Sequence, residues 1–140
     1  MDTYDGAMSS ASPSFASPEA LPSPPGYSHV VSIPSGRLVW TSGQVAMDAE
    51  GSVIAAGSWE NQARAVFANL TTALEAAGAG WADVVKLTFY VVDASELVTI
   101  RAVRDEFVDR DRPPTSTLVQ VAGLFHPDLL LEVEAVAWLP

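Results

Sequence analysis

The sequence predicts one two-layer domain, in which helices pack against a β-sheet. Residues 59–77 are apolar at spacings of three and four, which places a hydrophobic stripe on one face of a helix. Residues 84–92 follow as a β-branched and aromatic run with almost no turn-forming residues, as expected of a strand deep in a sheet. A long amphipathic helix that leads straight to a buried strand is the nucleus of a two-layer α/β domain.

Length and composition narrow the possibilities. A chain of 140 residues, 49% of them hydrophobic, allows one domain with a sizeable core, with or without a tail. No apolar run approaches the ~20 residues needed to cross a bilayer, and the acidic, Pro/Ser-rich N-terminus is unlike a secretory signal. The absence of cysteine excludes disulfides, a thiolate nucleophile and a Cys-ligated metal. We therefore expect a cytoplasmic protein with no membrane partner.

The net charge excludes a further class of partner. It is −10, and the chain has a single lysine, Lys86, with six scattered arginines. Proteins that bind nucleic acids neutralise phosphates with Lys and Arg, so this acidic surface would repel nucleic acids and anionic membranes. Neither is expected as a partner.

The N-terminal segment differs in composition from the rest. Residues 1–25 hold half of the ten prolines with many Ser and Ala, a composition that buries too little apolar surface to offset the entropy of ordering. This predicts a flexible arm over residues 1–25, followed by a domain over residues 26–140. Met8 could be an alternative start, and the arm could instead dock on a neighbouring subunit through Phe15 or Leu21.

The domain begins with strand patterns and continues into the first helix. Strands are predicted over residues 27–33 and 37–45, with a short one over 52–55, separated by turn signals. Ser58 is a suitable N-cap for the helix, and Gly78 is a suitable residue just past its end.

A second helix and two closing strands complete the domain. The helix is predicted over residues 95–108, with a buried stripe of Leu97, Ile100, Val103 and Phe107. Its charged set, Arg101, Arg104, Asp105 and Glu106, is expected to be mostly exposed. The closing strands are predicted over residues 115–122 and 129–138, so the order of elements is βββ-α-β-α-ββ.

Chemistry alone shows no strong catalytic motif. There is no phosphate-binding glycine loop, no HExxH and no GxSxG. His29 and His126 are far apart, and neither has a second histidine or a ligand-spaced carboxylate nearby, so no metal site is expected. We expect His29 to be a strand residue and His126 to be a loop residue.

Three polar features are candidates for a site, and each has a structural alternative. The segment 41–44 (TSGQ) ends a strand, where Gly permits close backbone approach and Ser can donate or accept; the alternative is a β-bulge or strand exit. Glu132 and Glu134 share a strand face roughly 7 Å apart, so they could act as a general acid or base or lie on a solvated sheet edge. The polar run 112–117 could be plain turn chemistry.

Taken together, five stretches resemble the RidA/YjgF family of reactive intermediate deaminases. They are TSGQV at 41–45, the QAR…NL…LEAAG…DVVK pattern over 62–86, FYVVD at 89–93, TSTLVQVAGL at 115–124 and LEVEAVA at 131–137. They occur in the order typical of the family, from about Tyr27 to the C-terminus.

The resemblance implies a fold, an assembly and a reaction. The implied fold is α+β and chorismate-mutase-like, with a mixed sheet and two helices on one face. The implied assembly is a homotrimer with clefts between adjacent subunits. Its best-known members speed the hydrolysis of enamine or imine intermediates such as 2-aminoacrylate to a 2-keto acid and ammonia, with no metal or organic cofactor.

The resemblance also implies residues of that cleft. The family tyrosine of the N-terminal segment falls on Tyr27, and the serine of the SGQ motif falls on Ser42, followed by Gly43. The glutamate credited with positioning the water falls on Glu132, which makes it the expected catalytic residue.

Ser116 marks a departure from the family pattern. Active deaminases carry an arginine at this position, which clamps the substrate carboxylate through two parallel hydrogen bonds. Serine has no charge, and losing a charge-assisted pair costs about 2–3 kcal/mol. Arg101, which takes the place of an asparagine on the second helix, or Arg112 could reach the cleft instead. Arg101, Ser116 and Thr117 would then bind substrate and set specificity.

Two functions agree with these residues. The first is a hydrolase that acts on an imine, an enamine or a similarly reactive small molecule, with Glu132 positioning the water. The second is a trimer that binds a small metabolite without deaminating it. The ribonuclease activity once ascribed to some relatives is disfavoured by the acidic surface.

Overall fold

The computed structural model describes residues 12–140, which contain six strands and two α-helices. The elements are β1 (Ser14–Ala16), β2 (Val30–Ser32), β3 (Arg37–Trp40), α1 (Trp59–Ala76), β4 (Val84–Val91), α2 (Leu97–Arg104), β5 (Thr115–Gln120) and β6 (Leu131–Leu139). Short 3-10 turns, Trp81–Asp83 and Ala94–Glu96, precede β4 and α2. The order βββ-α-β-α-ββ is the predicted one, but its first three strands are not the three predicted strands. β2 and β3 lie within the strands predicted over 27–33 and 37–45, whereas β1 was not predicted and no full strand forms over 52–55.

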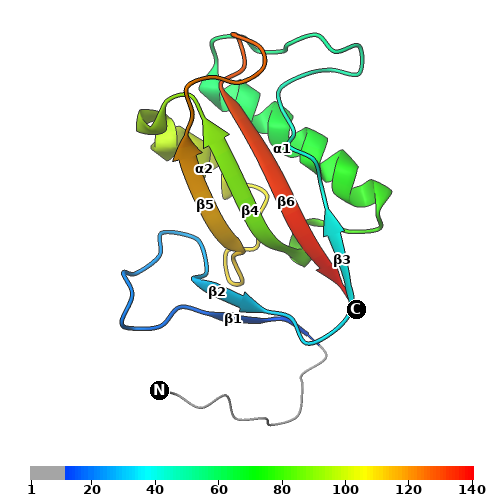
Figure 1. The fold of residues 1–140 in the computed structure, drawn as a ribbon, viewed down its shortest axis with the longest axis vertical. Helices are drawn as coiled ribbons and strands as arrows, with labels where there is room; N and C mark the ends of the chain where they lie inside the picture. The colour runs from blue at the N-terminus through cyan, green and yellow to red at the C-terminus, as the bar shows by residue number, and fades with distance from the viewer. Residues whose placement is uncertain (1–11) are drawn as a thin grey trace.

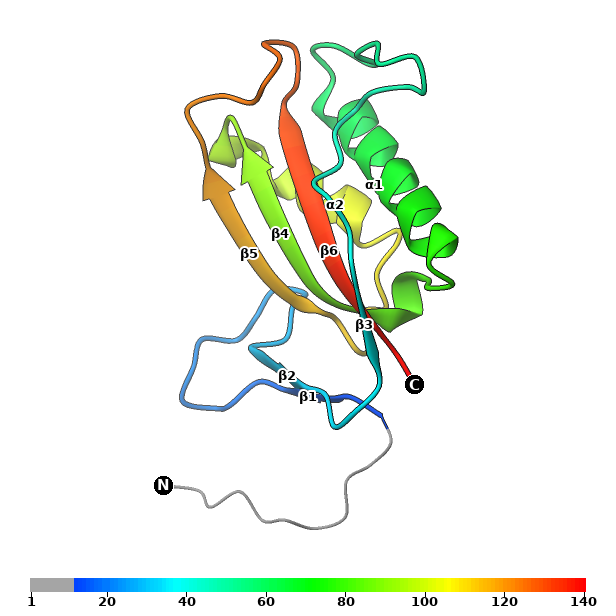
Figure 2. The same ribbon diagram turned by 45° about the vertical axis from the view of Figure 1, so that its right-hand side comes forward.

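The main sheet has four strands in the order β3-β6-β4-β5. β4 and β5 are parallel, whereas β6 is antiparallel to both of its neighbours, so the sheet is mixed. Both helices pack on one face of this sheet (Figure 1), and in the described part of the chain no helix covers the other face (Figure 2). The predicted two-layer α+β architecture is confirmed.

The core is built around α1, as its periodicity predicts. Ser58 caps the helix, its hydroxyl accepting a hydrogen bond from the backbone N–H of Asn61 at 3.3 Å. Gly78 follows the end of the helix with a φ of 77°, a conformation that favours glycine. The apolar stripe of Ala63, Val66, Phe67, Leu70 and Leu74 is fully buried. Each large side chain contributes about 1.5–3 kcal/mol by leaving water.

An aromatic cluster joins α1 to β4 and to the turn that follows α2. The Phe67 ring stacks on Phe107 and on Trp81, with centroids 5.1 and 5.2 Å apart, and lies 6.2 Å from Phe89. Aromatic pairs at these separations stabilise the packing by about 0.5–1.5 kcal/mol beyond their buried area. The cluster packs the turn after α2 against α1 and β4.

The N-terminal region departs from the prediction. The strand expected over 27–33 is limited to Val30–Ser32, and it pairs with β1, which lies inside the segment predicted as an arm. Prolines between these strands have no backbone N–H to donate, so that stretch forms no ladder. The Arg112 guanidinium lies 4.9 Å above the Phe15 ring and fastens β1 to the loop before β5. Met8 lies outside the described residues.

Other elements are also shorter than predicted. The strand expected over 37–45 ends at Trp40, and the strand expected over 52–55 is only a single bridge between Met47 and Val53. Ala55 has a φ of 56°, which breaks the extended conformation. The second helix covers eight residues because a 3-10 turn precedes it and 3-10 hydrogen bonds follow it. Within residues 12–140, no helix is long and apolar enough to cross a bilayer.

Candidate functional site

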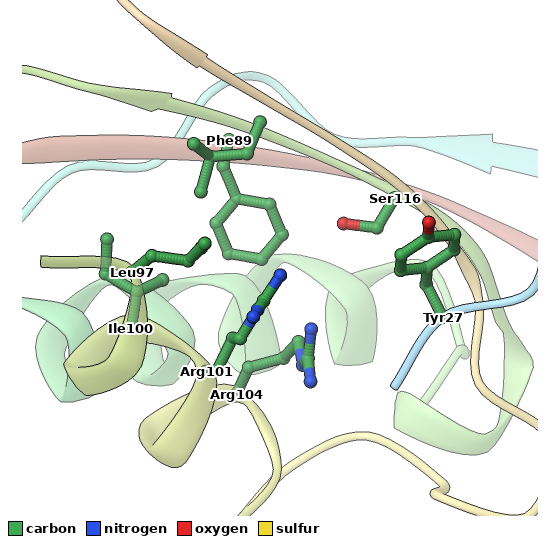
Figure 3. A pocket seen from close by; sticks show the side chains of 8 residues that line it. Tyr27, Phe89, Leu97, Ile100, Arg101, Arg104 and Ser116 are labelled. Carbon is green, nitrogen blue, oxygen red and sulfur yellow. The ribbon is translucent and has the colours of Figure 1, made fainter. Parts of the chain in front are cut away.

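A cavity of about 280 Å³ lies between α2 and the β4–β5 edge of the sheet (Figure 3). It is lined by Tyr27, Phe89, Leu97, Ile100, Arg101, Arg104, Ser116 and Leu118. Three of the residues predicted from sequence, Tyr27, Arg101 and Ser116, therefore meet in one place.

The strand register explains why Ser116 faces the cavity. Ser116 lies opposite Leu87 and Leu118 lies opposite Phe89, both of which point toward the helices. Successive residues of a strand point to opposite faces, so Thr117 points to the other side of the sheet. The structure thus separates Thr117 from Ser116, although both were predicted to bind substrate.

The α2 wall of the cavity contains an arginine that was predicted to be exposed. Leu97, Ile100, Arg101 and Arg104 follow the spacing of a single helix face and all line the cavity. The expectation that Arg104 is exposed is wrong, because its exposed fraction is 5%. Its Nη2 donates to Asp105 Oδ1 at 2.7 Å and to the carbonyl of Pro25 at 3.3 Å. The spacing was the signal that would have identified Arg104 as a cavity residue.

Hydrogen bonds hold the segment that carries Tyr27 against the loop before β5. The Ser28 hydroxyl donates to the carbonyl of Pro113 at 2.6 Å, and the Ser28 N–H donates to the carbonyl of Pro114 at 3.1 Å. Gly26 has a φ of 88°, and a Cβ at this position would overlap the Arg104 guanidinium. Tyr27 is thereby held at one side of the cavity, with Ser116 beside it and the two arginines extending from α2 (Figure 3).

The two arginines proposed as substitutes for the family arginine differ in position. Arg101 is partly buried and lines the cavity, whereas Arg112 is exposed and stacks on Phe15. Within residues 12–140, no hydrogen bond or ion pair engages the Arg101 guanidinium. Arg101 is therefore available to a ligand, and Arg112 is directed elsewhere.

A second group of predicted residues lies away from this cavity. From Trp40 to Gln44 the chain advances four residues, while the facing strand β6 advances three, from Val136 to Val133. The extra residue makes a bulge at Ser42 and Gly43, which is the structural alternative noted for this motif.

The bulge brings Gly43 against Glu132. A Cβ at position 43 would overlap the Glu132 carboxylate, so only glycine allows this close approach. Ser42 is exposed beside this contact, and Glu132 is partly buried. The three residues form a small polar group at the bulge.

Glu132 and Glu134 do not lie on a sheet edge. Their strand, β6, lies between β3 and β4, so the alternative of a solvated edge is wrong. Tyr90 on β4 faces Glu132 and donates a hydrogen bond from its hydroxyl to Glu134 Oε1 at 3.1 Å. This hydrogen bond raises the pKa of Tyr90 above its ordinary value, because the carboxylate stabilises the protonated phenol.

The histidines contribute to loop structure. His29 precedes β2 instead of lying in a strand, and its Nε2 hydrogen-bonds the carbonyl of Pro22 at 2.8 Å. His126 Nδ1 accepts a hydrogen bond from the N–H of Asp128 within the β5–β6 loop. Among the residues that the structure describes, no group of three or more His, Asp or Glu is placed to hold a metal ion.

Comparison with known proteins shows the family. The sequence model described as Endoribonuclease L-PSP matches residues 18–139. The crystal structure of YyfB from Yersinia pestis, titled as a member of the conserved Rid protein family, superposes with a TM-score of 0.80 and 36% identity, covering 91% of this chain and 98% of that chain. The chain belongs to the RidA/YjgF family.

Two relatives of this RidA/YjgF protein extend the comparison. A RutC family protein of Synechocystis is 34% identical over 109 residues, which are 77% of this chain and 83% of the relative. A protein of Salmonella typhimurium named 2-iminobutanoate/2-iminopropanoate deaminase is 32% identical over 111 residues, which are 78% of this chain and 85% of the relative. Membership in the family, as the sequence motifs predicted, is confirmed, and so is the fold.

Proposed function

We propose that this RidA/YjgF protein is a hydrolase that acts on a reactive imine or enamine and releases ammonia. The observation that carries the proposal is the cavity at Tyr27 and Ser116, which is small, half apolar and lined by polar side chains. The similarity to a relative named 2-iminobutanoate/2-iminopropanoate deaminase supports this reaction class.

The proposed reaction needs water and a group to orient it. Water adds to the C=N bond, so that its oxygen bonds to carbon and a proton passes to nitrogen. The carbinolamine then expels ammonia and leaves the carbonyl product. A carboxylate within hydrogen-bond reach of that water is the expected catalyst, and Glu132 is the residue proposed for it. This route requires no metal or organic cofactor.

The proposed site needs more than one subunit. Ser116 points to the helix-covered face of the sheet, whereas Glu132 points to the open face, where Tyr90 and Val119 also lie. One chain cannot direct both side chains into one cavity. We therefore propose that a homotrimer forms through the open faces, so that Glu132 of one subunit completes the cavity of the next.

The test is ammonia release from 2-iminobutyrate or 2-aminoacrylate generated in situ, with and without the protein. Acceleration by the wild-type protein that is lost in Glu132→Gln, while the trimer and its thermal stability are retained, is the expected result. Full activity in Glu132→Gln would overturn the assignment of Glu132. No acceleration by the wild-type protein would overturn the deaminase proposal.

A second function is favoured by Ser116 in place of the family arginine. In this alternative the trimer keeps the cavity for a small metabolite but has lost the deaminase reaction. It predicts that a metabolite raises the unfolding temperature in a concentration-dependent way without being converted. A screen of small metabolites that finds no stabilising compound would count against this alternative.

A ribonuclease is not supported, although the matching family model carries that description. The chain has a net charge of −10. RNA binding requires positive side chains that follow the phosphate backbone. Arg64 and Arg104 are occupied by carboxylates of the same chain, which leaves little positive charge for such a surface.

A further inference from the structure

The cavity beside α2 contains a cationic side chain that is free of partners within the described residues. In a chain with a net charge of −10, carboxylates are abundant, and Arg64 and Arg104 both pair with them. Arg112 instead stacks on Phe15. Arg101 is partly buried and lines the cavity, yet no carboxylate or carbonyl of residues 12–140 contacts its guanidinium. Its five N–H donors are therefore left for a ligand.

Arg104, the second arginine of the cavity, has a structural role. The Nε and Nη2 atoms of Arg104 both donate to Asp105 Oδ1, at 2.9 and 2.7 Å, and Nη2 also reaches the carbonyl of Pro25. Its charge is neutralised and its side chain is almost fully buried. Arg104 thus positions the segment that carries Tyr27, and it leaves the binding of an anion to Arg101.

The remaining walls limit the size and character of a ligand. Ser116 and Tyr27 place hydroxyl groups at one side of the cavity, and these groups border the same space as the guanidinium groups of Arg101 and Arg104 (Figure 3). The rest of the lining is apolar and consists of Phe89, Leu97, Ile100 and Leu118. A volume of about 280 Å³ admits a molecule with few heavy atoms.

We propose that Arg101 binds the carboxylate of a short-chain 2-imino or 2-keto acid. The planar guanidinium matches the two oxygens of a carboxylate, and the hydroxyl of Ser116 can donate a further hydrogen bond. The apolar wall then receives a short aliphatic side chain. The imine chemistry rests on the proposed function, whereas the carboxylate contact rests on this cavity alone.

The positive charge that binds the carboxylate is then supplied by helix α2 and not by strand β5. In this chain the positive group stands on helix α2, while the strand position beside it, Ser116, is neutral. Specificity for a carboxylate should therefore depend on Arg101 and be insensitive to Arg112.

The experiment measures binding of 2-oxobutyrate and of its neutral amide by calorimetry, so that no turnover is needed. The variants are Arg101→Gln, Arg101→Lys and the matched control Arg110→Gln. Arg110 is exposed, borders a neighbouring cavity and does not line this one, so it removes the same charge nearby. Far-ultraviolet circular dichroism and the unfolding temperature verify that each variant is folded.

The expected result is a preference of the wild type for the carboxylate over the amide. Arg101→Gln should weaken carboxylate binding about tenfold to a hundredfold and leave amide binding nearly unchanged. Arg101→Lys should retain part of the preference, and Arg110→Gln should behave as the wild type does.

Two results would overturn the proposal: no preference for the carboxylate in the wild type, or equal carboxylate binding in the wild type and Arg101→Gln. Failure of the proposed function is distinguishable from both. If the wild type hydrolyses no imine but shows an Arg101-dependent preference, the deaminase proposal fails and the carboxylate site stands. If it hydrolyses imines and Arg101→Gln has an unchanged KM and carboxylate affinity, only the carboxylate site fails.

Discussion

Ser116 on β5 and Glu132 on β6 point to opposite faces of the same sheet. Ser116 is in register with Leu87, which packs under the helices, whereas Glu132 is in register with Tyr90, which does not. The alternation of side chains along strands makes this arrangement a consequence of register. An active site that uses both residues must therefore draw them from two chains.

This relationship predicts complementation between two inactive variants. Ser116→Trp fills the cavity, and Glu132→Gln removes the proposed catalytic carboxylate, so each variant should be inactive when it alone forms the proposed homotrimer. Unfolding and refolding the two together should restore about a quarter of the wild-type activity. If subunits assemble at random, about a quarter of the interfaces combine a subunit with an intact Ser116 and a neighbour with an intact Glu132.

The control for complementation is a mixture of the two variants without unfolding, in which subunits do not exchange and activity stays absent. Sedimentation of the refolded mixture as trimers would show that assembly took place. Trimers without recovered activity would argue that both residues act within one chain or that one of them is not needed.

Gly43→Ala should disturb Glu132 specifically. The added Cβ would overlap the carboxylate, which lies at the end of a flexible side chain and can shift, so we expect a loss of only about 1 kcal/mol in the free energy of unfolding. Displacement of Glu132 by this methyl group should lower kcat/KM roughly a hundredfold. Denaturant unfolding and imine hydrolysis measure the two effects.

A double-mutant cycle shows whether that cost comes from Glu132. In the Glu132→Ala background, Gly43→Ala should cost much less, because the overlapping atoms are gone. Gly123→Ala is the matched control, since a Cβ there would meet no atom within 4 Å. An equal cost in both backgrounds would place the strain in the bulge backbone instead.

Gln62→Ala should destabilise the fold although the residue is polar. Gln62 is fully buried in α1, donates to the carbonyl of Asp128 at 2.7 Å and accepts from the N–H of Leu130 at 2.9 Å. Its loss leaves two partly buried backbone groups without these partners, which we expect to cost about 1–3 kcal/mol.

Chemical denaturation measures this cost, with Asn61→Ala as the control on the same helix. Asn61 is exposed, so its replacement should change the free energy of unfolding by less than about 0.5 kcal/mol. Equal effects of the two substitutions would mean that water replaces the hydrogen bonds of Gln62.

Tyr90 should titrate at a higher pH than an ordinary tyrosine. The hydrogen bond to Glu134 requires the protonated phenol and raises the pKa of Tyr90. The stability from this contact is fully present below the pKa of tyrosine in the unfolded chain, and it is lost as the pH rises through the higher folded pKa.

Tyrosinate absorbance as a function of pH tests this prediction, and Tyr90→Phe identifies which step belongs to this residue. Glu134→Gln should move that step toward the ordinary pKa, because the negative acceptor is removed. A step that does not move in Glu134→Gln would contradict the assigned cause.

Several features of the fold follow from local sequence. The three- and four-residue spacing in α1, the cap at Ser58 and the β-branched run of β4 each depend on residues close together in the chain, and the structure confirms them. Family motifs likewise identified the chain as a RidA/YjgF protein. The same motifs pointed to Tyr27, Arg101 and Ser116, which the structure brings to one cavity.

Only the tertiary structure decided how polar residues are used. Gln62 is buried, and so is Arg104, which was expected to be exposed. Both donate hydrogen bonds to distant backbone carbonyls, those of Asp128 and Pro25. The pairing of β1 with β2, and the separation of Ser116 from Glu132, likewise depend on which strands become neighbours. Periodicity shows which residues share one face of a helix or strand. Strand register and long-range hydrogen bonds determine which other residues pack against that face.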